Sequence, residues 1–196
     1  MTDRTLRVAL IIGSARKSRF TSTVAAWFHD RLAERPDVEA DVVDLAGVDL
    51  STGGPSHEPD AADVAVLAGT APRLAAADAF VVVTPEYNHS FPAALKNFVD
   101  WHLTEWSAKP VGFVSHGGIS GGLRAVEQLR QVFAELHAVT IRETVSFHGG
   151  PATFGDDGQP VAPEGCTGAA KVLLDQLQWW ALALREAKAR RPYLAG

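Results

Sequence analysis

Three polar segments of the sequence carry residue types that bind small anionic or ring-shaped ligands. They read GSARKSRFTS from Gly13, PEYNHSFP from Pro85 and HGGISGG from His116, and each follows an apolar run. Each is followed in turn by a stretch whose apolar residues have helical spacing. Open α/β sheets bind ligands in the loops at the carboxyl ends of their parallel strands. We therefore expect the three segments to meet at one edge of a sheet.

The first segment has the composition of a phosphate-binding loop. Its hydroxyl side chains and open backbone N–H groups precede a helix N-terminus, where partial positive charge favours an anion. Arg16 and Arg19 add full positive charges. The segment contains neither G-x-G-x-x-G nor Gly-Lys-Ser/Thr, so a Rossmann dinucleotide site and a Walker loop are both unsupported. The alternative interpretation is an ordinary helix cap with two solvated arginines.

The second and third segments suit a flat polar ring. Glycines 117 and 118 lack a Cβ, so a ligand can approach the main chain closely, although a flexible turn is the alternative. Backbone N–H and C=O groups from both segments could pair with the edge of such a ring. Glu86 could instead accept hydrogen bonds within its own turn. We interpret His89 as a residue of the site rim and Ser90 as a helix cap.

The elements that must position these segments alternate between strand and helix. Short β-branched runs predict parallel strands at 7–12, 38–44, 79–84, 111–115 and 139–145. Helical spacing predicts helices at 21–35, 72–77, from Pro92 onward, 122–136 and 167–184. Residues 45–69 form a long Gly-, Pro- and Asp-rich loop that we expect to be mobile or functional. A group of large apolar residues near one helix indicates a subunit contact; its members are Phe91, Phe98, Trp101 and Trp106.

The composition is that of an ordinary globular protein, and we expect one domain over residues 1–196. The chain is 46% hydrophobic and 21% charged, and its net charge of -5 argues against a general nucleic-acid binder. The single cysteine, Cys166, excludes an intramolecular disulfide and fits a reducing cytoplasm. Neither a signal peptide nor a membrane span is predicted. We expect a cytoplasmic protein that contacts neither nucleic acid nor membrane.

The sequence resembles the NADPH-dependent FMN reductase family, a flavodoxin-like group of flavin, quinone, azo-compound and chromate reductases. The resemblance is carried by IIGSARKSRF from Ile11, TPEYNHSFPAALKNFVDW from Thr84 and KPVGFVSHGGISGGLRAVEQLR from Lys109. It implies an α/β fold, namely a doubly wound five-stranded parallel sheet in the order 2-1-3-4-5 with helices on both faces. It also implies bound FMN, NADPH or NADH as co-substrate, a small-molecule electron acceptor, and a homodimer or tetramer.

The resemblance implies a set of FMN contacts. The phosphate would be held by Ser14, Arg16, Arg19, Phe20 and Thr21. The isoalloxazine ring and ribityl chain would lie against Pro85, Glu86, Tyr87 and Asn88, with Ser115, His116, Gly117 and Gly118 bordering the ring on its other side. The sequence departs from the common family pattern at Arg19, Thr21 and His116.

The chemistry expected from this cofactor needs no catalytic acid or base. A flavin accepts hydride at N5 from nicotinamide and passes electrons to a second acceptor, so we expect a ping-pong cycle in which the protein binds and orients the ring. A flavodoxin-type carrier without its own nicotinamide reaction is the alternative, and a module that has lost flavin is a third hypothesis. A metal site is unsupported, because the sequence has neither H-E-x-x-H nor a cysteine pair. A hydrolase is not favoured, because flavin chemistry needs no Ser-His-Asp arrangement.

Overall fold

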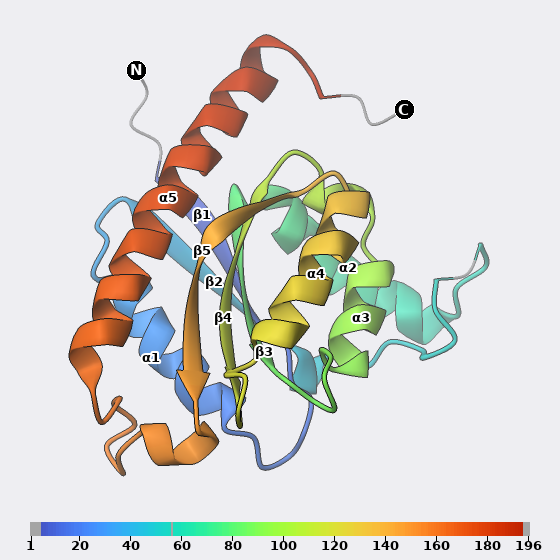
Figure 1. Cartoon of the computed structure of the whole chain (residues 1–196). Helices are drawn as coiled ribbons and strands as arrows, with labels where there is room; N and C mark the ends of the chain where they lie inside the picture. Colours follow the sequence, from blue (N-terminus) through green and yellow to red (C-terminus); the bar gives the residue numbers. More distant parts are fainter. Residues whose placement is uncertain (1–4, 56, 194–196) are drawn as a thin grey trace.

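Five strands form one parallel sheet, and their carboxyl ends share one edge. The computed structural model describes residues 5–55 and 57–193, so both ends of the predicted domain and residue 56 of the predicted long loop lie outside the described residues. The strands are β1 (Leu6–Ile12), β2 (Val38–Asp44), β3 (Ala79–Pro85), β4 (Pro110–Gly117) and β5 (Val139–His148). They are ordered β2-β1-β3-β4-β5 with every neighbouring pair parallel (Figure 1). The predicted flavodoxin-like order is confirmed.

Helices cover both faces of the sheet, as predicted (Figure 1). One face is covered by α1 (Thr21–Ala33) and α5 (Pro163–Arg190), and the other by α2 (Ala61–Ala76), α3 (Ala93–Asp100) and α4 (Leu123–Glu135). Trp27 and Phe28 fill the first apolar layer, whereas Trp106 and Phe133 fill the second. The strand β3 is buried at every position, which explains why its sequence is continuously apolar rather than alternating.

The helix α2 begins eleven residues before the predicted one, so the prediction of a loop through residue 69 is wrong. Asp60 caps the helix by accepting hydrogen bonds from the backbone N–H groups of Ala62 and Asp63, both at 2.9 Å. Gly69 and Pro72 lie inside the helix despite their poor helix propensity. Leu74 is fully buried against the sheet, and this packing outweighs the local preference. The loop between β2 and α2 is therefore 45–60, and it includes a short 3-10 turn at Leu45–Gly47.

The aromatic residues around α3 belong to the interior of the subunit. Phe98 and Trp106 are 1% and 0% exposed, and Trp101 is also buried. The indole of Trp101 donates to the carbonyl of Ser51 at 3.1 Å, which ties the β2–α2 loop to α3. The prediction that these three residues form a subunit contact is wrong, because they fill the core under a 3-10 turn at Thr104–Trp106.

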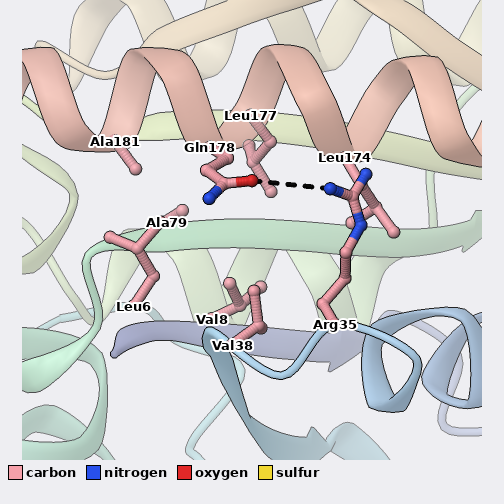
Figure 2. A pocket seen from close by; sticks show the side chains of 9 residues that line it. All are labelled: Leu6, Val8, Arg35, Val38, Ala79, Leu174, Leu177, Gln178 and Ala181. Atoms are coloured by element: carbon pink, nitrogen blue, oxygen red, sulfur yellow. Dashed lines mark hydrogen bonds between the residues drawn. The ribbon is translucent and has the colours of Figure 1, made fainter. Parts of the chain in front are cut away.

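The helix α5 is longer than the predicted 167–184, and its carboxyl-terminal part projects beyond the sheet (Figure 1). A small apolar cavity of about 10 Å³ lies between the middle of α5 and the amino ends of the strands. Figure 2 shows Arg35 and Gln178 joined across this cavity by a 3.5 Å hydrogen bond. Such a volume holds one water at most. The cavity lies at the opposite end of the sheet from the three polar segments and cannot take an organic ligand.

Among the helices of the described ranges, none combines the length and the apolar character that crossing a membrane requires.

Candidate functional site

The three predicted segments meet at the carboxyl edge of the sheet. The hydroxyl groups of Ser14, after β1, and Tyr87, after β3, share a hydrogen bond of 2.8 Å. The backbone N–H of Glu86, after β3, donates to the carbonyl of His116 in β4 at 3.0 Å. The parallel arrangement of β1, β3 and β4 brings these residues together although they are as much as 102 positions apart. The sequence prediction that the segments share one edge is confirmed.

The segment between β1 and α1 presents an uncompensated positive charge. Arg16 is exposed, its guanidinium carbon lies 3.8 Å from the ring centroid of Tyr87, and it pairs with no carboxylate among the described residues. Arg19, in contrast, forms an ion pair with Asp44 at the end of β2. The first turn of α1 has neither a side-chain cap nor an acidic residue. The guanidinium of Arg16 and the N-terminus of α1 together favour a bound anion. Arg16 can pair with such an anion because it has no carboxylate partner among the described residues.

The side chains of Phe20, Thr21 and His116, all of them predicted contact residues, turn toward the interior. Thr21 is fully buried, and its hydroxyl shares a hydrogen bond of 2.8 Å with Nε2 of His116. The ring of Phe20 packs edge-on against His116 at 5.0 Å and against Phe154 at 5.1 Å. These side chains therefore join α1 to β4 beneath the loops. Contacts of Phe20, Thr21 and His116 with a ligand through their backbone remain a prediction.

Burial lowers the pKa of His116 from 6.5 to about 4. Because an unfolded chain binds this proton near pH 6.5 and the folded protein only near pH 4, the free energy of unfolding falls as pH is lowered through that window. We expect a loss of roughly 3 kcal/mol from this group, complete below pH 4. Urea denaturation between pH 7 and 4 measures it. In His116→Tyr this part of the slope should vanish, and an unchanged slope would contradict the assignment.

Glu86 connects two of the loops rather than bonding within its own turn. Its side chain is only 6% exposed and pairs with Arg124 of α4 at 2.7 Å. It also accepts a hydrogen bond from the hydroxyl of Ser120 in the β4–α4 loop. The carboxylate therefore holds the turn after β3 at a fixed position relative to the β4–α4 loop. Sequence reasoning missed both partners, although they stand four residues apart inside the family-like block KPVGFVSHGGISGGLRAVEQLR.

The residues after Glu86 form a tight two-residue turn. Tyr87 and Ser90 pair through two backbone hydrogen bonds of 2.9 and 3.1 Å, and Asn88 and His89 occupy the turn positions. Both turn residues are exposed. The prediction that Ser90 caps the next helix is wrong, because the N-cap of α3 is Pro92 and the Ser90 hydroxyl donates to Oε1 of Gln128 at 2.6 Å.

The glycine-rich loop after β4 is held from below by hydroxyl groups. Ser115 and Ser146 both donate to the carbonyl of Gly121 at 2.8 Å. The backbone N–H of Gly149 donates to the carbonyl of Gly118 at 2.9 Å. Ser115 is fully buried, so its side chain fixes the loop and does not face the open edge. The loop therefore presents its backbone at a defined position.

An open hollow of about 290 Å³ adjoins the first segment at Ala15. It lies between the β2–α2 loop and the beginning of α3, where Ala93 and Ala94 leave space that larger side chains would fill. Asn97 fixes the loop by donating to the carbonyl of Leu50 at 3.1 Å. The hollow gives a ligand held at the first segment room on the α3 side.

The groups at this edge fit flavin mononucleotide. Arg16 and the uncapped N-terminus of α1 suit its phosphate. A Cβ added at Gly118 would meet no atom within 4 Å, so the loop offers open backbone to a flat ring. In residues 5–55 and 57–193, no three His, Cys, Asp or Glu side chains gather where they could hold a metal ion. The fold is flavodoxin-like, and the groups at this edge suit a flavin nucleotide.

Comparison with known proteins places the chain within one family. Residues 6–152 match the model of the NADPH-dependent FMN reductase family, and the chain belongs to that family. A probable NADPH:quinone oxidoreductase of Oryza sativa subsp. japonica is 32% identical over 201 residues, covering 99% of this chain and 98% of the relative. An NAD(P)H-dependent FMN reductase of Schizosaccharomyces pombe is 35% identical over 135 residues, covering 65% of this chain and 66% of the relative.

A solved structure supports the fold. The flavoenzyme NAD(P)H:(acceptor) oxidoreductase FerB from Paracoccus denitrificans superposes with a TM-score of 0.64 at 22% identity, covering 93% of this chain and 98% of that one. At this identity the likeness concerns the architecture alone.

Proposed function

We propose that this protein uses FMN to pass electrons from NAD(P)H to a small acceptor, either a quinone or a second flavin. Membership of the family and the names of the rice and fission-yeast relatives support the reaction and the acceptor classes. The observation that carries the proposal is the free guanidinium of Arg16 between the β1 loop and Tyr87. A surface cation without a carboxylate partner among the described residues, in the loop that leads into an uncapped helix N-terminus, is an arrangement that favours a phosphate.

The proposed contacts divide between side chains and backbone. Arg16 would hold the phosphate with the N–H groups that begin α1. Ser14, whose buried hydroxyl is bonded to Tyr87, would contribute through its backbone. The turn after β3 and the glycine loop after β4 would border the ring with backbone groups, while Glu86 keeps the two at a fixed separation. When bound, FMN would supply the redox chemistry, namely hydride transfer from NAD(P)H and electron transfer to the acceptor. The chain's own residues would bind and orient the cofactor, and none of them is assigned as a catalytic acid or base.

The test is anaerobic mixing of FMN-loaded protein with NADPH and, separately, NADH. Loss of the oxidised flavin absorbance, followed by its return when a quinone is added, is the expected result. A flavin band that NAD(P)H leaves unchanged, but that dithionite bleaches, would instead identify a flavodoxin-type carrier. Protein that takes up no FMN would overturn both functions. The ratio of the two reduction rates gives the nucleotide preference.

The proposal extends to assembly and location. We infer a homodimer or a tetramer from the family resemblance, and sedimentation or light scattering measures it. The single half-buried Cys166 is compatible with a reducing cytoplasm, which supports the proposed location.

A further inference from the structure

The turn after β3 contains two residues in a backbone conformation that side chains disfavour. Asn88 has φ of +50° and His89 has φ of +74°. Asparagine and histidine enter the left-handed region more often than most side chains, but the second position of a two-residue hairpin turn favours glycine. Such a conformation persists only where surrounding contacts over-determine it, and strained turns gather at ligand sites. Something outside the turn must therefore hold it.

The contacts from outside the turn come from α4, the helix that follows the neighbouring strand β4, and from the loop before it. Arg124 and Gln128 stand four residues apart in α4 and so share one side of that helix, whereas Ser120 precedes the helix in the β4–α4 loop. Ser120 and Arg124 engage Glu86, as described above. Gln128 engages the turn itself: its Nε2 donates to the carbonyl of His89 at 3.0 Å, and its Oε1 accepts from the Ser90 hydroxyl at 2.6 Å.

We propose that Gln128 is a positioning residue of the FMN site, acting through the strained turn and not by touching the cofactor. This inference rests on the proposed function, because the turn is placed in the candidate site. An amide is needed at position 128, since one end must donate to a carbonyl and the other must accept from a hydroxyl. A glutamate could accept from Ser90 but could not donate to His89. Gln128 therefore fixes where the backbone of residues 87–90 stands.

The first experiment compares Gln128→Ala with Gln131→Ala. Gln131 is an exposed glutamine of the same helix, and removing it controls for the change in helix propensity. In FMN-free protein, hydrogen exchange of the Tyr87 and Ser90 amides should become roughly tenfold faster in Gln128→Ala alone, because two hydrogen bonds to the turn are lost. FMN affinity, measured by quenching of flavin fluorescence, should fall on the order of tenfold in the same variant. Gln128→Glu should behave like the alanine variant.

The second experiment is a rescue. His89→Gly removes the side chain that disfavours the turn conformation. In the Gln128→Ala background it should restore most of the FMN affinity and slow the exchange. A role of Gln128 in helix packing alone would not be rescued in this way.

Three results would overturn the proposal: Gln128→Ala behaving like Gln131→Ala, faster exchange without weaker FMN binding, or no rescue by glycine. If the wild-type protein binds no FMN, the proposed function fails. The positioning role then fails with it, and the exchange rates of FMN-free protein still show whether Gln128 holds the turn.

Discussion

Arg16→Ala is expected to weaken FMN binding by roughly 10- to 100-fold, the range that corresponds to losing hydrogen bonds to a charged group. The folded state should be unaffected, because Arg16 is exposed, stacks on Tyr87 and forms no ion pair with a carboxylate among the described residues. A fluorescence titration with FMN gives the dissociation constant. Thermal unfolding of FMN-free protein should give a midpoint within about 2 °C of wild type, as for an ordinary surface substitution.

Two neighbouring cations serve as controls for this prediction. Lys17→Ala removes an exposed charge from the same loop and should change FMN affinity less than Arg16→Ala. Arg19→Ala should chiefly lower stability, because Arg19 is largely buried and leaves Asp44 unpaired. If all three variants lose FMN affinity equally, the effect is general electrostatic attraction and Arg16 is not the phosphate partner.

The sequence predicted the three inner strands β1, β3 and β4 well because strands buried on both faces leave a nearly continuous apolar run. It failed at α2 for a physical reason. Gly69 and Pro72 oppose helix formation locally, whereas Asp60 as cap and Leu74 as core residue favour it. The packing of Leu74 against the sheet depends on strands distant in the sequence, so local spacing could not weigh it against the two helix breakers.

The same limit applies to the site. The sequence predicted which loops meet, since topology alone decides this for parallel strands. It could not predict that the side chains of Thr21 and Ser115 turn inward, because side-chain direction depends on the neighbouring element. Nor could it find the pairing of Ser90 with Gln128, which joins positions 38 residues apart. The structure thus moves part of the predicted contact set from ligand binding to support of the loops.

The glycines of the loop after β4 differ in what the fold requires of them. Gly122 has φ of +88°, and a Cβ there would lie 2.7 Å from the Cβ of Ser115 and 2.9 Å from the backbone nitrogen of His116. Gly117 is confined by the backbone nitrogen of Gly122 at 3.0 Å. Only around Gly118, within this group of three, would a Cβ meet nothing within 4 Å. The fold therefore favours glycine at positions 117 and 122. At position 118 the fold would accept a side chain, so a glycine there is more simply explained by a bound ligand that approaches the backbone.

Gly122→Ala and Gly118→Ala should consequently have opposite signatures. Gly122→Ala combines an unfavourable φ with backbone clashes, and we expect it to lower the free energy of unfolding by about 3 kcal/mol or more. Gly118→Ala should unfold at the wild-type urea midpoint, yet bind FMN roughly tenfold more weakly because its methyl group keeps the ring away from the backbone. Urea denaturation and FMN titration separate the two effects. Undiminished FMN affinity in Gly118→Ala would show that the ring does not approach the loop there, and the proposed border of the site would have to exclude it.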